Sequence, residues 1–198
     1  DKGLKVHHSN LCSEITLPTN EERTAVCCLS SVNLEYFDEW SKEELFIEDL
    51  MRMLDNTLTK FIKSAPLTMK KAITSAESER SVGLGTMGFH SYLQRSGIAL
   101  QSPMSMGPNL KIFKHIKNKC DAANLLLGKE RGEAPDLKGT GKRFSHMIAI
   151  APNASSSIIC GNTSPSIEPL RANAFSQKTL SGSFLIKNKY LEELLEKK

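Results

Sequence analysis

The sequence has no long apolar run and few features of an exported or nucleic-acid-binding protein. Its 198 residues contain no stretch of about 18 apolar residues, the length that a membrane-spanning helix needs. No basic segment followed by an apolar one opens the chain, so a secretion signal is not indicated. The net charge is only +4, and lysines and arginines are spread along the chain. These absences predict no membrane partner, no nucleic-acid partner and a cytoplasmic location.

Cysteine is scarce and irregularly spaced. The five cysteines are Cys12, Cys27, Cys28, Cys120 and Cys160. An odd number without a C-x-x-C pair argues against both a disulfide framework and a zinc site. A metal site at His8 and Cys12 lacks further ligands. We therefore predict that the chain binds no metal and that its cysteines are free thiols in a reducing compartment. One or two of these thiols are expected to be reactive.

Periodic apolar residues predict helices that alternate with short strands. Ser41 and Glu44 form a capping box before a helix that ends at Pro66. Further helices are predicted over 67–79, 87–95, from Asn109 to a stop at Gly128, over 155–160 and at the C-terminus. Strands are predicted over 25–34, 147–151 and 182–186, and a surface loop over 129–146. Strands separated by helices indicate the α/β class.

Residues Asn10-Leu11-Cys12-Ser13-Glu14 combine an amide, a thiol and a carboxylate. In an extended segment, alternate residues point to the same side, so Asn10, Cys12 and Glu14 would share a face. Cysteine can act as a nucleophile or a hydrogen-atom carrier, and glutamate can accept a proton from a substrate hydroxyl. Spacing alone leaves a second interpretation open, an exposed polar edge with a chance cysteine.

Cys27 and Cys28 are adjacent in the predicted strand 25–34. Neighbouring strand residues face opposite sides, so the two thiols cannot both enter one site. By pattern alone, two small core residues are the simpler interpretation.

The segment 83–88, GLGTMG, has the letters of the dinucleotide-binding fingerprint G-x-G-x-x-G. The preceding AITSAESER is polar and helical rather than a strand, and no βαβ unit frames the segment. We therefore expect a tight helix-to-helix turn with close packing instead of a nicotinamide or flavin site.

The segment 151–157, APNASSS, follows a predicted strand and precedes a helical turn. Backbone N–H groups at a helix start, with hydroxyls beside them, can bind an anion such as phosphate. Simple serine capping of the helix explains the same letters equally well.

Four segments in order resemble the large subunit of ribonucleotide reductase. They are SNLCSEITLPT at 9–19, AVCCLSSVNL at 25–34, RSVGLGTMGFHSYL at 80–93 and IAPNASSSIICGNTSPSIEP at 150–169. In the family these look like the finger loop, a barrel strand with one redox cysteine, a glycine-rich stretch and the substrate-phosphate loop.

The resemblance implies a role for each matching residue. Cys12 would form the thiyl radical that abstracts the ribose 3′-hydrogen, Glu14 would take the 3′-hydroxyl proton, and Asn10 would orient the reacting groups. Cys27, rather than Cys28, would be one of two cysteines that reduce the 2′-position. The phosphates would be bound by Asn153, Ala154, Ser155 and Ser156. The resemblance assigns no role to Cys28, Cys120 or Cys160.

The resemblance also implies an incomplete α/β fold, the C-terminal half of a ten-stranded barrel with its finger loop. Residues 1–24 would be the finger-loop segment and 25–198 the truncated second half. The chain starts with Asp1 and stops in the helical run KYLEELLEKK, so we expect a segment of a longer polypeptide that is inactive alone. The second redox cysteine, the allosteric sites and the radical-relay tyrosines would lie outside it.

The implied partners are a ribonucleoside diphosphate, the rest of the large subunit, a second large subunit in a homodimer and a radical-generating small subunit. This segment would bind no cofactor itself. The radical would come from a diiron-tyrosyl small subunit or from adenosylcobalamin, and thioredoxin or glutaredoxin would be the external reductant. Two alternatives stay open, an adenosylcobalamin-dependent relative and a non-catalytic piece that completes a split large subunit.

Overall fold

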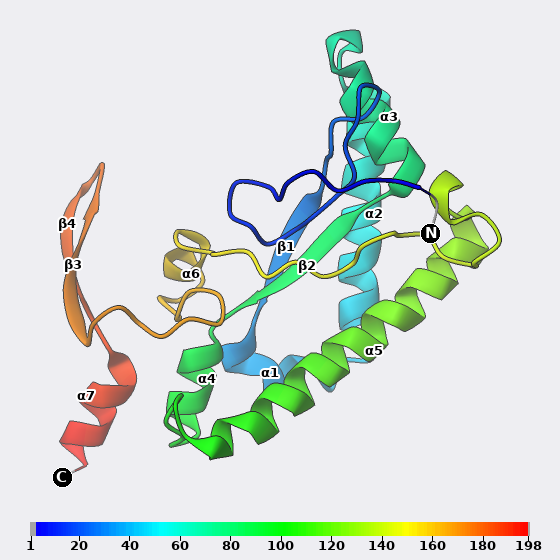
Figure 1. Ribbon diagram of the computed structural model, residues 1–198. Coiled ribbons are helices and arrows are strands. Elements are labelled where there is room, and N and C mark those ends of the chain that lie inside the picture. The colour runs from blue at the N-terminus through cyan, green and yellow to red at the C-terminus, as the bar shows by residue number, and fades with distance from the viewer. Residues whose placement is uncertain (1–2, 198) are drawn as a thin grey trace.

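Two parallel strands form the centre of the computed structural model, which describes residues 3–197. Strand β1 (Cys28–Asn33) pairs with β2 (Val82–Met87), with Cys28 opposite Val82 and Asn33 opposite Met87. Parallel neighbours need a crossover connection, and helices α2 (Phe46–Ser64) and α3 (Lys70–Glu79) provide it. Figure 1 shows α2 behind the strands, α5 running diagonally below them and the N-terminal segment (blue) in front.

Further elements complete the chain. The α-helices are α1 (Phe37–Trp40), α4 (Phe89–Arg95), α5 (Met106–Arg131), α6 (Ser156–Ile159) and α7 (Lys189–Glu196). The 3₁₀ turns are η1 (Leu34–Tyr36), η2 (Leu67–Met69), η3 (Pro103–Ser105) and η4 (Pro135–Leu137). An antiparallel hairpin of β3 (Ala174–Thr179) and β4 (Gly182–Lys187) extends away from the central strands (Figure 1). The α/β class predicted from the sequence is confirmed.

One face of the strand pair is covered by helices. Leu58 of α2, Leu84 of β2 and Ile116 of α5 are at most 1% exposed and belong to one continuous apolar cluster. The helices are long because their apolar residues recur at helical spacing, so each presents one stripe to the strands. Burial of this stripe, rather than intrinsic helix propensity, is what stabilises them.

On the opposite face of β2, two glycines allow the segment that contains Ala149 to lie close to the strand. A Cβ at Gly83 would lie 2.7 Å from the Cβ of Ala149, and one at Gly85 would lie 2.4 Å from the carbonyl oxygen of Ala149. The backbone N–H of Leu84 donates to the carbonyl of Met147 at 2.8 Å. Glycine is required here because another backbone segment lies directly against the strand.

These contacts correct the interpretation of the G-x-G-x-x-G letters. Residues 82–87 form a buried strand, not a helix-to-helix turn, although the predicted close packing is confirmed. The predicted strand 147–151 forms a single parallel bridge from Ile148 to Leu84 rather than a full strand.

Helix boundaries also differ from prediction. Ser41 ends α1 instead of capping α2, which begins at Phe46 without a side-chain cap. Helix α5 runs through Gly128 to Arg131. Gly128 is needed there for packing, because a Cβ would lie 2.0 Å from the carbonyl oxygen of Gly141.

A buried carboxylate joins three parts of the fold. Asp55 of α2 is fully buried and accepts hydrogen bonds from Arg80 at 2.6 Å, Arg131 at 2.7 Å and Arg143 at 3.0 Å. Burial alone raises the pKa of Asp55, but the bonds from Arg131, Arg143 and Arg80 outweigh it and hold the pKa below its ordinary value.

We predict that Asp55→Asn lowers the free energy of unfolding by about 3–5 kcal/mol, because it leaves buried arginines uncompensated. The exposed pair Arg95–Glu39, at 3.3 Å, offers a control: Glu39→Gln should cost under about 1 kcal/mol. Urea unfolding measures both.

The pH dependence follows from the lowered pKa. The stabilisation is present above the unfolded value of about 4 and is lost as pH falls through the lower folded value. The difference between Asp55 and its Asn variant should therefore shrink below about pH 4. A difference that stayed constant down to the acid transition would contradict the ion-pair account.

Candidate functional site

The segment 9–15 forms a tight loop instead of an extended strand. The N–H of Asn10 donates to the Ile15 carbonyl, and the N–H of Ser13 donates to the Asn10 carbonyl, both at 3.1 Å. Ser13 has a φ of +60°, in the left-handed region that closes such turns. The prediction that Asn10, Cys12 and Glu14 share a strand face is therefore wrong, because the backbone reverses between them.

The loop places its three functional candidates differently. Cys12 is exposed at the turn. The Oδ1 atom of Asn10 accepts a hydrogen bond from the N–H of Ile15 at 3.2 Å, so part of this side chain closes the loop. Glu14 is half-buried, and its Oε2 atom is enclosed without a hydrogen-bond partner among residues 3–197. A buried carboxylate oxygen without a partner is costly, so this atom can accept a hydrogen bond from a bound group.

Ile15 and Leu17 fix this segment to the sheet. Both are buried and pack with Ala149 in a second apolar cluster that also contacts Cys27. This cluster lies on the glycine side of β2, opposite the helices. Residues 15–17 are therefore held beside Cys27 by packing.

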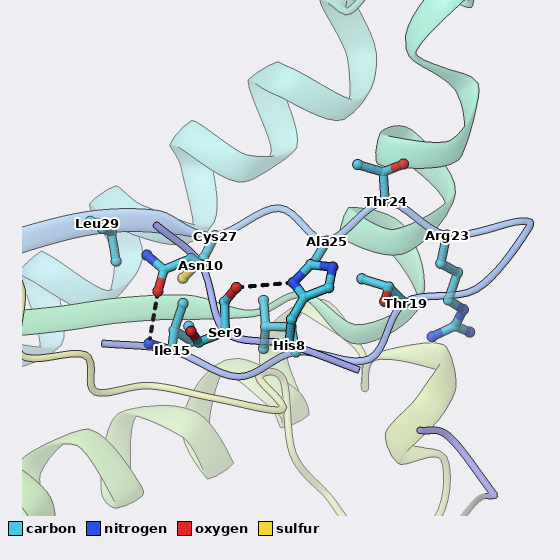
Figure 2. A pocket seen from close by; sticks show the side chains of 11 residues that line it. His8, Ser9, Asn10, Ile15, Thr19, Arg23, Thr24, Ala25, Cys27 and Leu29 are labelled. Carbon is cyan, nitrogen blue, oxygen red and sulfur yellow. Dashed lines mark hydrogen bonds between the residues drawn. The ribbon is translucent and has the colours of Figure 1, made fainter. Parts of the chain in front are cut away.

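The loop and β1 enclose a cavity of about 360 Å³. It is lined by His8, Ser9, Asn10, Ile15, Leu17, Thr19, Arg23, Thr24, Ala25, Cys27 and Leu29 (Figure 2). Of the residues predicted from the sequence, Asn10 and Cys27 line it together. Cys12, Glu14 and residues 153–156 do not.

His8 and Arg23 were missed by the sequence interpretation as residues of this cavity. His8 stands two residues before Asn10, and its Nδ1 lies 2.9 Å from the Ser9 carbonyl oxygen, a contact drawn in Figure 2. Its nearness to the finger-loop motif was an available signal. Arg23 gave none, because its partner Asp136 lies 113 residues away.

Cys27 and Cys28 face opposite sides, as strand alternation predicted. Cys28 packs against the helix-covered cluster, whereas Cys27 packs with Ile15 and Leu17 on the finger-loop side. Burial is the main cause that raises the pKa of Cys27 to about 12, and the charge of Glu14 adds a smaller effect in the same direction. Cys27 is therefore a protonated thiol at neutral pH, suited to giving up a hydrogen rather than to attacking as a thiolate.

The loop 151–160 is attached to the carboxyl ends of both strands. The Nδ2 atom of Asn153 donates to the carbonyls of Thr86 at 3.0 Å and Ala151 at 2.9 Å. The Nδ2 atom of Asn33 donates to the Cys160 carbonyl at 3.3 Å. The Asn153 side chain thus holds the loop in place instead of pointing outward.

The remaining loop groups are available for an anion. No acceptor is found among the described residues for the backbone N–H groups of Ala154 and Ser155. Ser155 and Ser156 are exposed. Their hydroxyls and these N–H groups can together bind a phosphate, while Asn153 contributes through the loop conformation, with its φ of +55°.

Neither a metal cluster nor a membrane span is found in the described part of the chain. Residues 3–197 contain no group of three or more His, Cys, Asp or Glu side chains that could hold a metal ion. None of the described helices is long and apolar enough to cross a membrane.

Comparisons with known proteins show the family to which the chain belongs. The sequence matches the family described as "Ribonucleotide reductase, barrel domain" over residues 2–140 and 134–198. The chain therefore belongs to the ribonucleotide reductase barrel-domain family.

Individual relatives include viral and bacterial proteins. A ribonucleoside-diphosphate reductase large subunit of Invertebrate iridescent virus 3 is 57% identical over 99% of this chain and 31% of its own length. A putative large subunit of Frog virus 3 is 49% identical over 98% of this chain and 35% of its own. The solved Actinobacillus ureae class Id ribonucleotide reductase alpha subunit is 41% identical, with a TM-score of 0.90 over 99% of this chain and 36% of its own. The chain thus spans about a third of the length of these relatives and corresponds to a fragment of the barrel.

We predict that four of the five thiols separate into a fast and a slow pair on alkylation with iodoacetamide at pH 8. Cys12 and Cys160 are exposed, whereas burial raises the pKa of both Cys27 and Cys120 to about 12. Each pKa unit above the working pH lowers the thiolate fraction about tenfold, so the exposed pair should react more than about tenfold faster. Peptide mass spectrometry measures the rates, and unfolding in urea should equalise them. Rapid labelling of Cys27 in the folded chain would contradict its placement.

Proposed function

We propose that this chain is the part of a ribonucleoside-diphosphate reductase large subunit that carries the radical cysteine and one reducing cysteine. The observation that supports this most is the cavity that Asn10 of the finger loop and Cys27, the residue just before β1, line together. A loop with an exposed thiol beside a strand with a protonated thiol suits hydrogen-atom transfer to a bound sugar. We also propose the division into a finger-loop segment, residues 1–24, and a truncated barrel half, residues 25–198.

The proposed reaction uses the two thiols in different ways. Cys12, as a thiyl radical, takes the hydrogen from the ribose 3′-carbon. The enclosed Glu14 carboxylate accepts the proton of the 3′-hydroxyl, which makes loss of the 2′-hydroxyl as water easier. The Nδ2 atom of Asn10 is the group that this side chain can offer to the sugar, since its Oδ1 is bonded to the N–H of Ile15.

Cys27 supplies reducing equivalents at the 2′-carbon. Together with a second cysteine, which in the family lies upstream of this segment, it gives two electrons and two protons and ends as a disulfide. The 2′-hydroxyl leaves as water, a C–H bond replaces it, and Cys12 recovers its radical by returning a hydrogen to the 3′-carbon. A thioredoxin or glutaredoxin would then reduce the disulfide.

The diphosphate would sit on the loop 153–156. Ala154 and Ser155 offer backbone N–H groups and Ser155 and Ser156 offer hydroxyls, at the carboxyl ends of β1 and β2. Such N–H and hydroxyl groups are donors that match the negative charge of a phosphate.

The radical would come from outside this chain. The likeness to a class Id alpha subunit favours a radical-generating partner subunit over adenosylcobalamin. A homodimer of complete large subunits and a cytoplasmic location belong to the same proposal.

The test is Cys12→Ser in the complete large subunit that contains this chain, assayed with its radical-generating subunit for deoxyribonucleoside diphosphate. A serine hydroxyl holds its hydrogen too strongly to form the required radical, so turnover should fall to background. Cys160→Ser is the matched control, because Cys160 is also exposed and has no proposed role. We expect it to retain activity within about twofold.

Turnover that survived Cys12→Ser would refute the radical assignment. If both variants lost activity, Cys12 would not differ from an exposed thiol without a proposed role, and the radical assignment would fail as well.

A further inference from the structure

A two-pronged ion pair ties the cavity to a distant loop. The Nη1 and Nη2 atoms of Arg23 donate to the two carboxylate oxygens of Asp136 at 2.5 and 3.0 Å. The two side chains are only 14% and 18% exposed, so solvent screens them little. The bond from Asp136 raises the pKa of Arg23. A fork-to-fork arginine–carboxylate pair fixes direction as well as distance.

Each partner sits where a fixed position matters. Arg23 lines the cavity and lies four residues before Cys27, in the segment that leads from the finger loop into β1. The next residue, Thr24, is fixed by its N–H, which donates to the Lys71 carbonyl at 3.2 Å. Any shift of this segment is carried directly to Cys27, because only two residues separate Thr24 from it.

The loop that carries Asp136 is itself held in shape. The Glu133 carboxylate accepts hydrogen bonds from the backbone N–H groups of Gly139, at 2.6 Å, and Gly141. Asp136 also lines a second cavity with Leu4 and Pro18, both from the finger-loop segment. The loop thus offers Arg23 an anchor that lies against the finger-loop segment as well.

We propose that Arg23 and Asp136 are positioning residues, a clamp that sets Cys27 against the substrate cavity, an inference that rests on the proposed function. Arg23 acts through Asp136 rather than by binding the nucleotide phosphates, since both of its terminal nitrogens are occupied by the carboxylate. The proposed phosphate groups lie elsewhere, at residues 153–156.

The experiment is a double-mutant cycle in the complete large subunit with its radical-generating partner. The variants are Arg23→Ala, Asp136→Ala and the double change, each measured for kcat, for KM and for the alkylation rate of Cys27 relative to Cys28. Arg52→Ala is the matched control. Arg52 makes an equally two-pronged pair with Glu130, at 2.6 and 3.0 Å, between α2 and α5, away from the residues that line the cavity.

We expect Arg23→Ala and Asp136→Ala each to lower kcat about ten- to a hundredfold, the loss typical of a reacting group displaced by about 1 Å. The double variant should lose no more than either single one, because both changes open the same clamp. KM should stay within about twofold, Cys27 should alkylate faster while Cys28 does not change, and Arg52→Ala should keep kcat within about twofold.

Two results would overturn the clamp. Equal losses of kcat in Arg23→Ala and Arg52→Ala would show that the Arg23–Asp136 pair contributes only to the stability of the fold. Unchanged kcat in Asp136→Ala, or a raised KM in Arg23→Ala alone, would instead make Arg23 a substrate-binding residue. Failure of the proposed function is recognised separately, because turnover would then survive Cys12→Ser whatever the Arg23 variants do.

Discussion

The buried Asp55 carboxylate is the interaction on which the central strands depend. It binds Arg80 at the end of α3, Arg131 at the end of α5 and Arg143 in the following loop. Strand β2 begins two residues after Arg80, and the segment that lies against β2 begins at His146, three residues after Arg143. The Asp55 carboxylate therefore fixes the positions at which β2 and the segment against it begin. The close packing on the glycine face of β2 requires these two segments to be in register.

The two faces of the strand pair then divide structure from chemistry. Helices bury one face, which takes Cys28 into the apolar core. Gly83 and Gly85 leave the other face without side chains, so Ala149 can approach closely, and Ile15 and Leu17 pack against Ala149. Cys27 lies on this second face, beside the cavity that Asn10 also lines. Strand alternation thus gives adjacent cysteines different environments, and only one of them meets the substrate in the proposed function.

Sequence patterns predicted what depends on local periodicity or on ordered motifs. They gave the long helices, the opposite facing of Cys27 and Cys28 and the family. They missed what depends on distant partners. Residues 82–87 were predicted to form a turn, because the sequence does not show that their glycines make room for Ala149. Arg23 carried no local signal, because its partner Asp136 is remote in the sequence. The tight turn within 9–15 was not predicted, because the backbone and side-chain hydrogen bonds that join Asn10 and Ile15 leave no periodic pattern in the sequence. Hairpin strand β3 was missed because its letters, AFSQKT, show no clear apolar alternation.

The most direct test of the account is a single turnover by the pre-reduced complete large subunit, with its radical-generating partner and no external reductant. Deoxynucleotide formed per subunit and the oxidation state of Cys27 would be measured together, the latter by differential alkylation and mass spectrometry. We expect Cys27 to enter a disulfide in step with product while Cys28 stays a free thiol. Product formed while Cys27 remains a free thiol would contradict it.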